Sequence, residues 1–210
     1  MTVGVSTSFR GPAGQEVTAS PLAIADPAPL GLACFGLTTL CLSVINAGWL
    51  DASATPMVLA FALPVGGVTQ ILAGMWAFRR GTAFPATAFS AYGAFWISFF
   101  LLIQYFVPAI AATKGAPATA VTGAIGLFLF AWGIFTAYML VASFAVNKAL
   151  PVVFTLLAAT FFALAIGFWA DSTGWHNVGG YLGILTAIGA LYVSFADIVK
   201  ATFKRDILPT

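Results

Sequence analysis

Six long apolar stretches constrain this chain more than any other feature of its sequence. They fall at about residues 29–50, 56–78, 84–111, 118–146, 150–170 and 179–199. A helix that rises 1.5 Å per residue crosses a hydrocarbon core of roughly 30 Å in about 20 residues, so each stretch can span a membrane. The chain is 61% hydrophobic and 7% charged, whereas about 25% of residues in a soluble domain are charged. We predict an all-α integral membrane protein whose six transmembrane helices form a bundle.

Charged and turn-forming residues separate the six spans and define the domains. The five turns are expected at Asp51 to Pro56, Arg79 to Gly81, Lys114 to Pro117, Asn147 to Lys148 and Asp171 to Asn177. Residues 1–25 are rich in Gly, Pro, Ser and Thr and have no apolar run of signal-peptide length, so we predict a disordered N-terminal tail. Residues 26–200 are the predicted transmembrane transport domain, and residues 201–210 are a short C-terminal tail.

The distribution of Lys and Arg predicts the orientation. The N-terminal tail, the second and fourth turns and the C-terminal tail carry seven of the eight basic residues, and the remaining one is Lys114. Because basic residues favour the cytoplasmic side, both termini are expected in the cytoplasm of a multi-pass protein in the plasma membrane. The basic residues stand singly or in pairs, so nothing indicates nucleic acid as a partner.

The residue types needed for bond-breaking chemistry are nearly absent from the spans. All six acidic residues lie in tails, turns or at the end of a span, and the single histidine, His176, falls in the expected fifth turn. Cys34 and Cys41 are about 10 Å apart along one helix, too far for a disulfide. We therefore predict no enzyme activity, no cofactor and no metal site. A retinal protein is disfavoured because it would need a lysine buried within a helix.

Neutral polar groups are what the spans offer to a passing solute: Thr38, Thr39, Asn46, Gln70, Tyr92 and Gln104. Phe35, Thr39 and Asn46 follow one another at offsets of four and seven, so they share one face of the first helix. Such a stripe suits the wall of a narrow pore that hydrogen-bonds a carboxyl group. Hydrogen bonding between helices is the alternative use of the same groups.

The second span contains a candidate helix break. Pro64 lacks a backbone N–H and crowds the carbonyl group of Ala60, and the following Gly66 and Gly67 leave the backbone uncovered. We predict a kinked or opened turn, whose free N–H groups would be able to bind an anion at the bundle interior. A simple packing kink is the alternative.

The first span begins with a proline-rich motif. Pro27 and Pro29 suit a first helical turn, and Asp26 before them is a good N-cap. The sequence Asp26-Pro27-Ala28-Pro29-Leu30-Gly31-Leu32, followed by Phe35, resembles the Asn-Pro-x-Pro-x-Gly-Leu-x-x-Phe signature of the acetate uptake (succinate–acetate permease) family. Asp26 stands where that signature has Asn. The resemblance extends in order over about residues 26–208, through Gly66-Gly67-x-x-Gln70, Tyr92-Gly93-x-Phe95-Trp96, Trp132-Gly133-x-Phe135 and Ala165-Ile166-Gly167.

The resemblance implies a transporter or channel for small carboxylates, acetate and possibly succinate. It implies a hydrophobic constriction at Phe35, Tyr92 and Leu157 within each subunit, and a homo-oligomer, expected to be a hexamer. An anion channel and a proton-coupled symporter both fit. From the residues themselves, a neutral-solute or ammonium channel and a non-transporting structural membrane protein stay open as alternatives.

Overall fold

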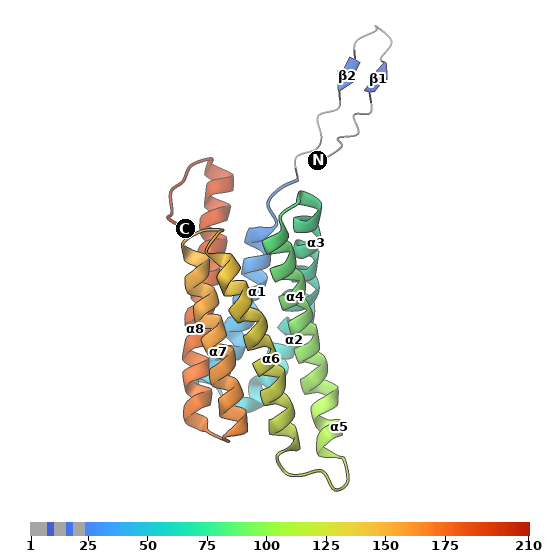
Figure 1. Ribbon diagram of the computed structural model, residues 1–210, viewed down its shortest axis with the longest axis vertical. Helices are drawn as coiled ribbons and strands as arrows, with labels where there is room; N and C mark the ends of the chain where they lie inside the picture. The colour runs from blue at the N-terminus through green and yellow to red at the C-terminus, as the bar shows by residue number, and fades with distance from the viewer. Residues whose placement is uncertain (1–7, 11–15, 19–23) are drawn as a thin grey trace.

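The structure, a computed structural model, describes residues 8–10, 16–18 and 24–210. Six helical spans run side by side as a bundle (Figure 1), which confirms the predicted fold class. The first span is α1 (Ala28–Asn46), and the last three are α6 (Ala120–Ser143), α7 (Ala149–Trp169) and α8 (Thr173–Phe203). The second joins η1 (Ala52–Ala54), α2 (Thr55–Phe61), η2 (Ala62–Thr69) and α3 (Gln70–Arg80), and the third joins α4 (Ala83–Leu101), η3 (Leu102–Phe106) and α5 (Val107–Ala111).

Two short strands are described within the N-terminal tail. β1 (Ser8–Arg10) pairs antiparallel with β2 (Glu16–Thr18), with Ser8 opposite Thr18. Most of residues 1–25 lies outside the described residues, so disorder of this tail stays a prediction.

Several helix ends differ from the sequence prediction, among them the end of α8, which runs to Phe203 and past the predicted limit of 199. α1 ends at Asn46 rather than Leu50, followed shortly by Gly48 with φ +78°. α8 begins at Thr173 because the Ser172 hydroxyl accepts a hydrogen bond from the Trp175 N–H, at 3.5 Å. The fifth turn is therefore shorter than predicted. His176 lies on the first turn of α8 and not in a loop, which corrects our placement of this residue.

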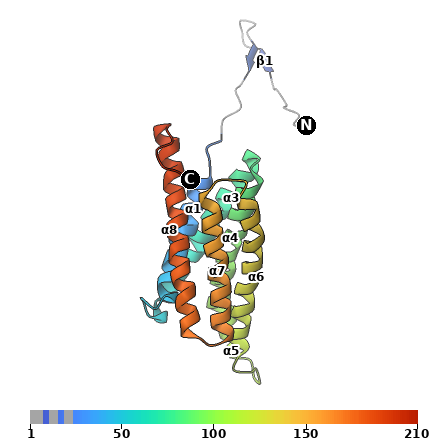
Figure 2. The ribbon, with the colours of Figure 1, turned by 60° about the vertical axis from the view of Figure 1, so that its left-hand side comes forward.

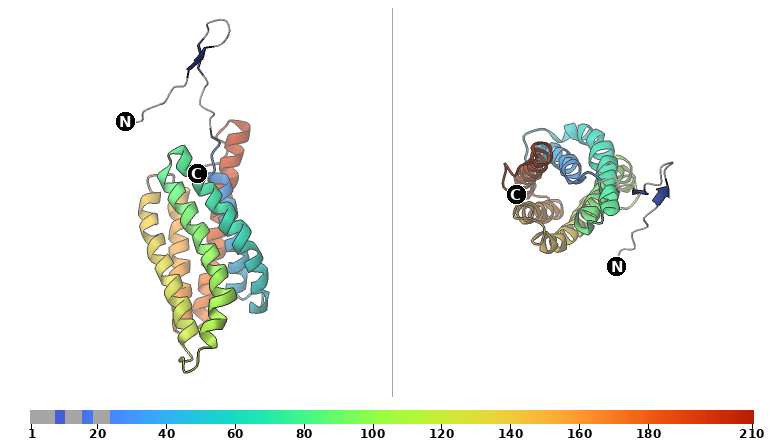
Figure 3. Two further views of the ribbon diagram at one scale, coloured as in Figure 1. Left: turned by 90° about the vertical axis from the view of Figure 1, so that its right-hand side faces the viewer. Right: turned by 90° about the horizontal axis from the view of Figure 1, so that it is seen from above.

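The helices are arranged in a ring when seen along the bundle axis (Figure 3), with α6, α7 and α8 next to one another (Figure 2). α8 closes the ring by packing along α1. At one end of this contact the Ser194 hydroxyl donates to the Pro29 carbonyl oxygen at 2.6 Å. The first and last spans are therefore direct neighbours, and the start of α1 and the end of α8 lie at the same end of the bundle (Figure 1).

The segment around Pro64 widens into a π-helix, η2, and the chain stays helical through it. Proline supplies no N–H to the ladder and pushes the preceding turn open, which favours the wider π geometry. The Thr69 hydroxyl donates to the Pro64 carbonyl oxygen at 2.9 Å. A Cβ atom at Gly66 would lie 2.7 Å from the Trp96 ring and one at Gly67 would lie 2.6 Å from Ile97. Glycine here lets η2 approach α4 closely.

Candidate substrate path

Two cavities lie at opposite ends of the bundle. The first has a volume of about 270 Å³ and opens near Asp26 and Asn147. The second has a volume of about 630 Å³ and opens near Asp51 and His176. We call them the Asp26 cavity and the His176 cavity. Asn147 lies in the loop between α6 and α7. Its carboxamide oxygen accepts hydrogen bonds from the backbone N–H groups of Ala149 and Leu150, at the start of α7.

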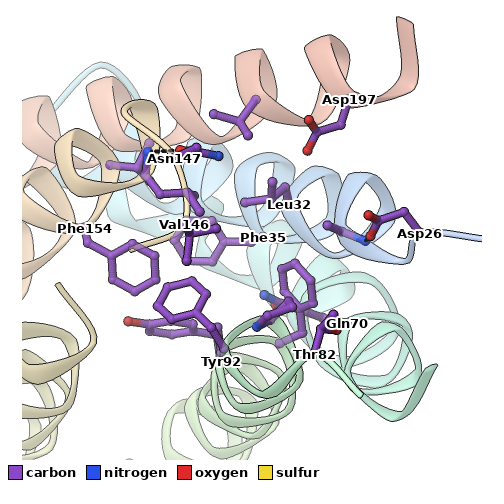
Figure 4. Close-up of a pocket in the computed structure, with 18 of the residues that line it drawn as sticks. Asp26, Leu32, Phe35, Gln70, Thr82, Tyr92, Val146, Asn147, Phe154 and Asp197 are labelled. Carbon is purple, nitrogen blue, oxygen red and sulfur yellow. Dashed lines mark hydrogen bonds between the residues drawn. The ribbon is translucent and has the colours of Figure 1, made fainter. Parts of the chain in front are cut away.

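The three residues expected to form a constriction all line the Asp26 cavity. Phe35 comes from α1, Tyr92 from α4 and Leu157 from α7, and each is at least 95% buried. The Phe35 and Tyr92 rings lie 5.5 Å apart between centroids, and Phe154 lies 6.1 Å from Tyr92 (Figure 4). Side chains far apart in the sequence thus converge on one apolar cluster inside the bundle.

A second layer of aromatic side chains lies beyond this cluster and separates the two cavities. Phe95 is its centre, with ring centroids 5.3 Å from Trp132 and 5.3 Å from Phe161. None of these three lines either cavity. Phe95 follows Tyr92 by three residues and Phe161 follows Leu157 by four, so both lie one helical turn along the same faces. Sequence reasoning missed this layer, although the spacing was a signal for it.

The Tyr92 hydroxyl does not face the mouth of the Asp26 cavity. It lies 2.9 Å from Thr136 Oγ1, whose own hydrogen is donated to the Trp132 carbonyl oxygen at 2.7 Å. The Tyr92 O–H is therefore the donor to Thr136, and in Figure 4 it points away from Asp26. The one proton of this hydroxyl, which we counted from the sequence among the polar groups offered to a solute, is thus used between α4 and α6.

The predicted polar residues divide between the two cavities. Gln70 is 1% exposed and lines the Asp26 cavity, and Asn46 lines the His176 cavity. Thr39 is 6% exposed, lines neither cavity, and has a hydroxyl without a hydrogen-bond partner among the described residues. The Gln70 side-chain oxygen likewise lacks a partner within the described chain. Since buried polar groups are usually paired, the Gln70 oxygen, which belongs to a residue lining a cavity, is the one of the two that is placed to meet a solute.

Two further polar residues lie away from both cavities. Thr38 is fully buried and donates to the Cys34 carbonyl oxygen at 2.9 Å. Its hydroxyl would lie 2.9 Å from a Cβ atom at Gly66, so it faces η2. Gln104 is exposed on the outside of the bundle within η3. Neither residue lines a cavity, so the interhelical alternative suits Thr38.

The proline-rich motif and the π segment position helices around the path. Of the motif residues Asp26, Pro27, Pro29, Leu30 and Gly31, only Asp26 lines a cavity. Leu30 is 50% exposed on the outside, and a Cβ atom at Gly31 would lie 2.6 Å from the Phe89 ring. Pro64, Gly66 and Gly67 line neither cavity. A packing role therefore accounts for these contacts, and anion binding by this segment stays a prediction.

Charged groups surround the mouth of the Asp26 cavity. Asp26 accepts a hydrogen bond from the Ala28 N–H at 3.0 Å and forms an ion pair with Arg80 at 2.8 Å. Asp197, from α8, lines the same cavity (Figure 4). Its neighbour Lys200 is paired with Asp206 at 2.6 Å. The carboxylates of Asp26 and Asp197 both repel an entering anion, and the positive charge of Arg80 offsets the negative charge of Asp26.

The His176 cavity is the more polar of the two. Asn46, Asn177 and Thr173 line it together with His176, and Asp51 lies at its rim. Ser53 lowers the pKa of Asp51 because its side chain and its backbone N–H, at 2.9 Å, hydrogen-bond the carboxylate. Asp51 is therefore ionised under ordinary conditions.

Among residues 8–10, 16–18 and 24–210, no group of three or more His, Cys, Asp or Glu side chains is placed to hold a metal ion. A six-helix membrane bundle with a cavity at each end and an apolar partition between them is the architecture of a channel or transporter. The fold and this path together therefore indicate a membrane channel or transporter.

Comparison with known proteins identifies the family. Residues 12–205 match the GPR1/FUN34/yaaH family, and the chain belongs to that family. Acetate permease A of Emericella nidulans is 38% identical over 195 residues, covering 88% of this chain and 65% of that protein. The succinate-acetate/proton symporter SatP of Escherichia coli is 32% identical over 186 residues, covering 89% of this chain and 95% of that one.

A solved structure matches the whole bundle. The structure of the bacterial acetate channel SatP superposes with a TM-score of 0.79 at 32% sequence identity, covering 89% of this chain and 99% of that chain. The six-helix architecture and the family resemblance expected from the sequence are therefore confirmed. The named relatives are transporters or channels, which agrees with a multi-pass membrane protein that is not an enzyme.

Proposed function

We propose that this protein moves short carboxylates across a membrane, with acetate as the leading substrate and succinate as a second one. The observation that carries the proposal is the pair of cavities at the two ends of the bundle, with Phe35, Tyr92 and Leu157 lining the first and the Phe95 layer lying beyond them. The relatives named as an acetate permease and a succinate-acetate/proton symporter support the choice of substrate. The path runs within one subunit, because a single chain supplies both cavities and the partition.

The apolar partition favours a small substrate that becomes protonated or loses its hydration water where it crosses the apolar layer. Apolar rings close a pore to water and ions by dewetting, while cavities on both sides stay hydrated. A carboxylic acid can cross such a layer as the neutral acid, or as an anion when the rings move apart. Gln70 on one side and Asn46 on the other offer hydrogen bonds at the two approaches.

The cellular setting is part of the proposal. The excess of Lys and Arg at the end where α1 begins and α8 ends supports placing both termini in the cytoplasm. The plasma membrane is the proposed location. Many large apolar side chains are exposed around the bundle, among them Leu127, Val141 and Phe195. They suit contact with lipid and with further copies of the chain, for which we propose a hexamer.

Uptake into vesicles tests the proposed function. Purified protein in liposomes should accumulate radiolabelled acetate faster than empty liposomes do, and unlabelled succinate should compete. Leu157→Trp places a larger side chain in the constriction and should reduce this uptake in protein that still elutes as a single species. Uptake no faster than in empty liposomes, from protein shown to be folded, would contradict the proposal. Radiolabelled methylammonium in the same vesicles tests the ammonium alternative.

A further inference from the structure

His176 is fixed in an orientation that leaves one ring nitrogen available. Its Nδ1 lies 3.0 Å from the Ser172 carbonyl oxygen, which also accepts the His176 backbone N–H at 3.1 Å. A carbonyl oxygen only accepts hydrogen bonds, so Nδ1 carries a proton. In the neutral ring Nε2 is then the basic nitrogen.

The ring is held on two sides by α7. The Phe168 ring meets it edge to face, with centroids 4.6 Å apart and planes at 87°. A Cβ atom at Gly167 would lie 3.2 Å from the ring, so glycine there allows α8 to bring the imidazole close to α7. These contacts give the side chain one position, at the edge of the His176 cavity.

The other polar groups of the cavity complement a carboxyl group. Asn46 from α1 and Asn177 from α8 both line it, and each carries an amide NH₂ group that can donate to a carboxylate oxygen. Asp51 from the first turn is the other titratable group that lines this cavity. As an anion it opposes the entry of a lone carboxylate. The cavity is therefore better matched to a carboxylate that arrives together with a proton.

We propose that the His176 cavity is a loading site for short-chain carboxylic acids, in which His176 Nε2 takes up the carboxyl proton. The acid O–H bond breaks, its electron pair stays on the carboxylate, and an N–H bond forms at Nε2. Asn46 and Asn177 hold the carboxylate beside the imidazolium. The net charge of the cavity is unchanged by loading, and reversal of the step returns the neutral acid that the apolar partition favours. The inference rests on the proposed carboxylate transport and assigns the transported proton to His176 Nε2.

Proton uptake with the anion predicts a pH-dependent affinity. When one proton binds with each acetate anion, linkage makes the apparent Kd rise about tenfold per pH unit on the alkaline side of the transition. The change His176→Gln removes the basic Nε2 and cannot accept the acid proton, so it should flatten this dependence. The matched variant Asn177→Ala should weaken acetate binding at every pH and leave the slope in place.

The single histidine of the chain makes a direct measurement possible. The protein, carrying an affinity tag without histidine and labelled with ¹⁵N in its imidazole, is placed in lipid nanodiscs. Sodium acetate is then titrated at several pH values and constant ionic strength. We expect a saturable shift of the Nε2 resonance with acetate and none with chloride.

Each other outcome overturns the inference. A His176 signal that ignores acetate, or that responds equally to chloride, shows that no carboxylate site includes this ring. A His176→Gln variant with the wild-type pH slope shows that the proton is held elsewhere. These failures are distinct from failure of the proposed function, because in them the wild-type protein still takes up acetate into liposomes.

Discussion

At the level of a single side chain, we propose that Leu157 sets the width of the path. It is 4% exposed and lines the Asp26 cavity beside Phe35 and Tyr92. Leu157→Ala should raise uptake of lactate relative to acetate, because it removes three carbon atoms from the narrow layer. The variant should also lose about 2–5 kcal/mol of stability, as buried Leu→Ala changes usually do.

A matched control for this change is Leu156→Ala. Leu156 adjoins Leu157 on α7 but lines neither cavity, so its truncation should leave the lactate-to-acetate ratio as in wild type. Radiolabelled uptake of the two acids in the same liposomes gives the ratio. An unchanged ratio in folded Leu157→Ala protein would remove Leu157 from the constriction.

The Tyr92 hydroxyl has a structural role that the sequence did not indicate. Because it donates to Thr136 between α4 and α6, Tyr92→Phe should cost about 0.5–1.5 kcal/mol of stability. The acetate-to-succinate ratio should stay close to that of wild type. Thermal unfolding in detergent and competitive uptake measure the two effects. A large change in selectivity with no loss of stability would show that the Tyr92 hydroxyl contacts the substrate.

Asp26 replaces the Asn of the family signature and is paired with Arg80. A carboxylate repels a passing anion by about 1 kcal/mol at a separation of roughly 6 Å in a water-like medium. Asp26→Asn keeps an oxygen that can accept the Ala28 N–H and leaves Arg80 unopposed at the mouth. We therefore expect acetate uptake near neutral pH to rise severalfold. The gain should shrink at lower pH, because more of the substrate is then uncharged.

The reverse change tests the same electrostatic argument. Arg80→Gln removes the cation and leaves Asp26 and Asp197 at the mouth, so uptake of the anion should fall. Initial rates from pH 5 to pH 8 at equal protein levels measure both variants. Identical rates for wild type, Asp26→Asn and Arg80→Gln would show that this ion pair lies off the path.

At the scale of helices, close contact between η2 and α4 depends on glycine. A Cβ atom at Gly66 would meet both the Trp96 ring and the Thr38 hydroxyl within 3 Å. Gly66→Ala should therefore destabilise the bundle by about 1–3 kcal/mol through overpacking. Gly123→Ala on α6 is the control, since its Cβ atom would meet nothing within 4 Å. The difference in thermal unfolding temperature reports the effect, and equal temperatures for the two variants would contradict it.

The helices themselves were largely predictable from the sequence. Hydropathy and charged turns placed six spans, because lipid demands long apolar helices with satisfied backbones. Pro64 indicated an irregular turn. The early start of α8 was missed because a single hydroxyl, that of Ser172, decides it.

The side-chain arrangement inside the bundle was less predictable. Tyr92 and Thr136 are 44 residues apart, and only the packing of α4 on α6 brings them together. The division of Asn46 and Gln70 between two cavities likewise depends on helix rotation, which no local pattern specifies. The constriction trio came from the family resemblance, whereas the Phe95 layer behind it required the structure.

For the whole molecule, the exposed apolar surface leads to a prediction about assembly. In lipid, helices associate through close packing rather than through burial from water. A homohexamer with one path per chain should give a mass about six times the 21.8 kDa of the chain by native mass spectrometry from nanodiscs or mild detergent. A monomer that still takes up acetate would disprove the hexamer and leave the transport proposal intact.

The contact between α1 and α8 affects how the protein is made. The first span to leave the ribosome packs along the last one. The Pro29 carbonyl oxygen on α1 cannot accept its hydrogen bond from Ser194 until α8 has been made. During synthesis α1 must therefore remain in the membrane without its main neighbour until translation ends. A chain truncated before α8 should be a substrate for membrane quality control. A circular permutant that joins the end of α8 to the start of α1 should let these two helices meet early and mature faster.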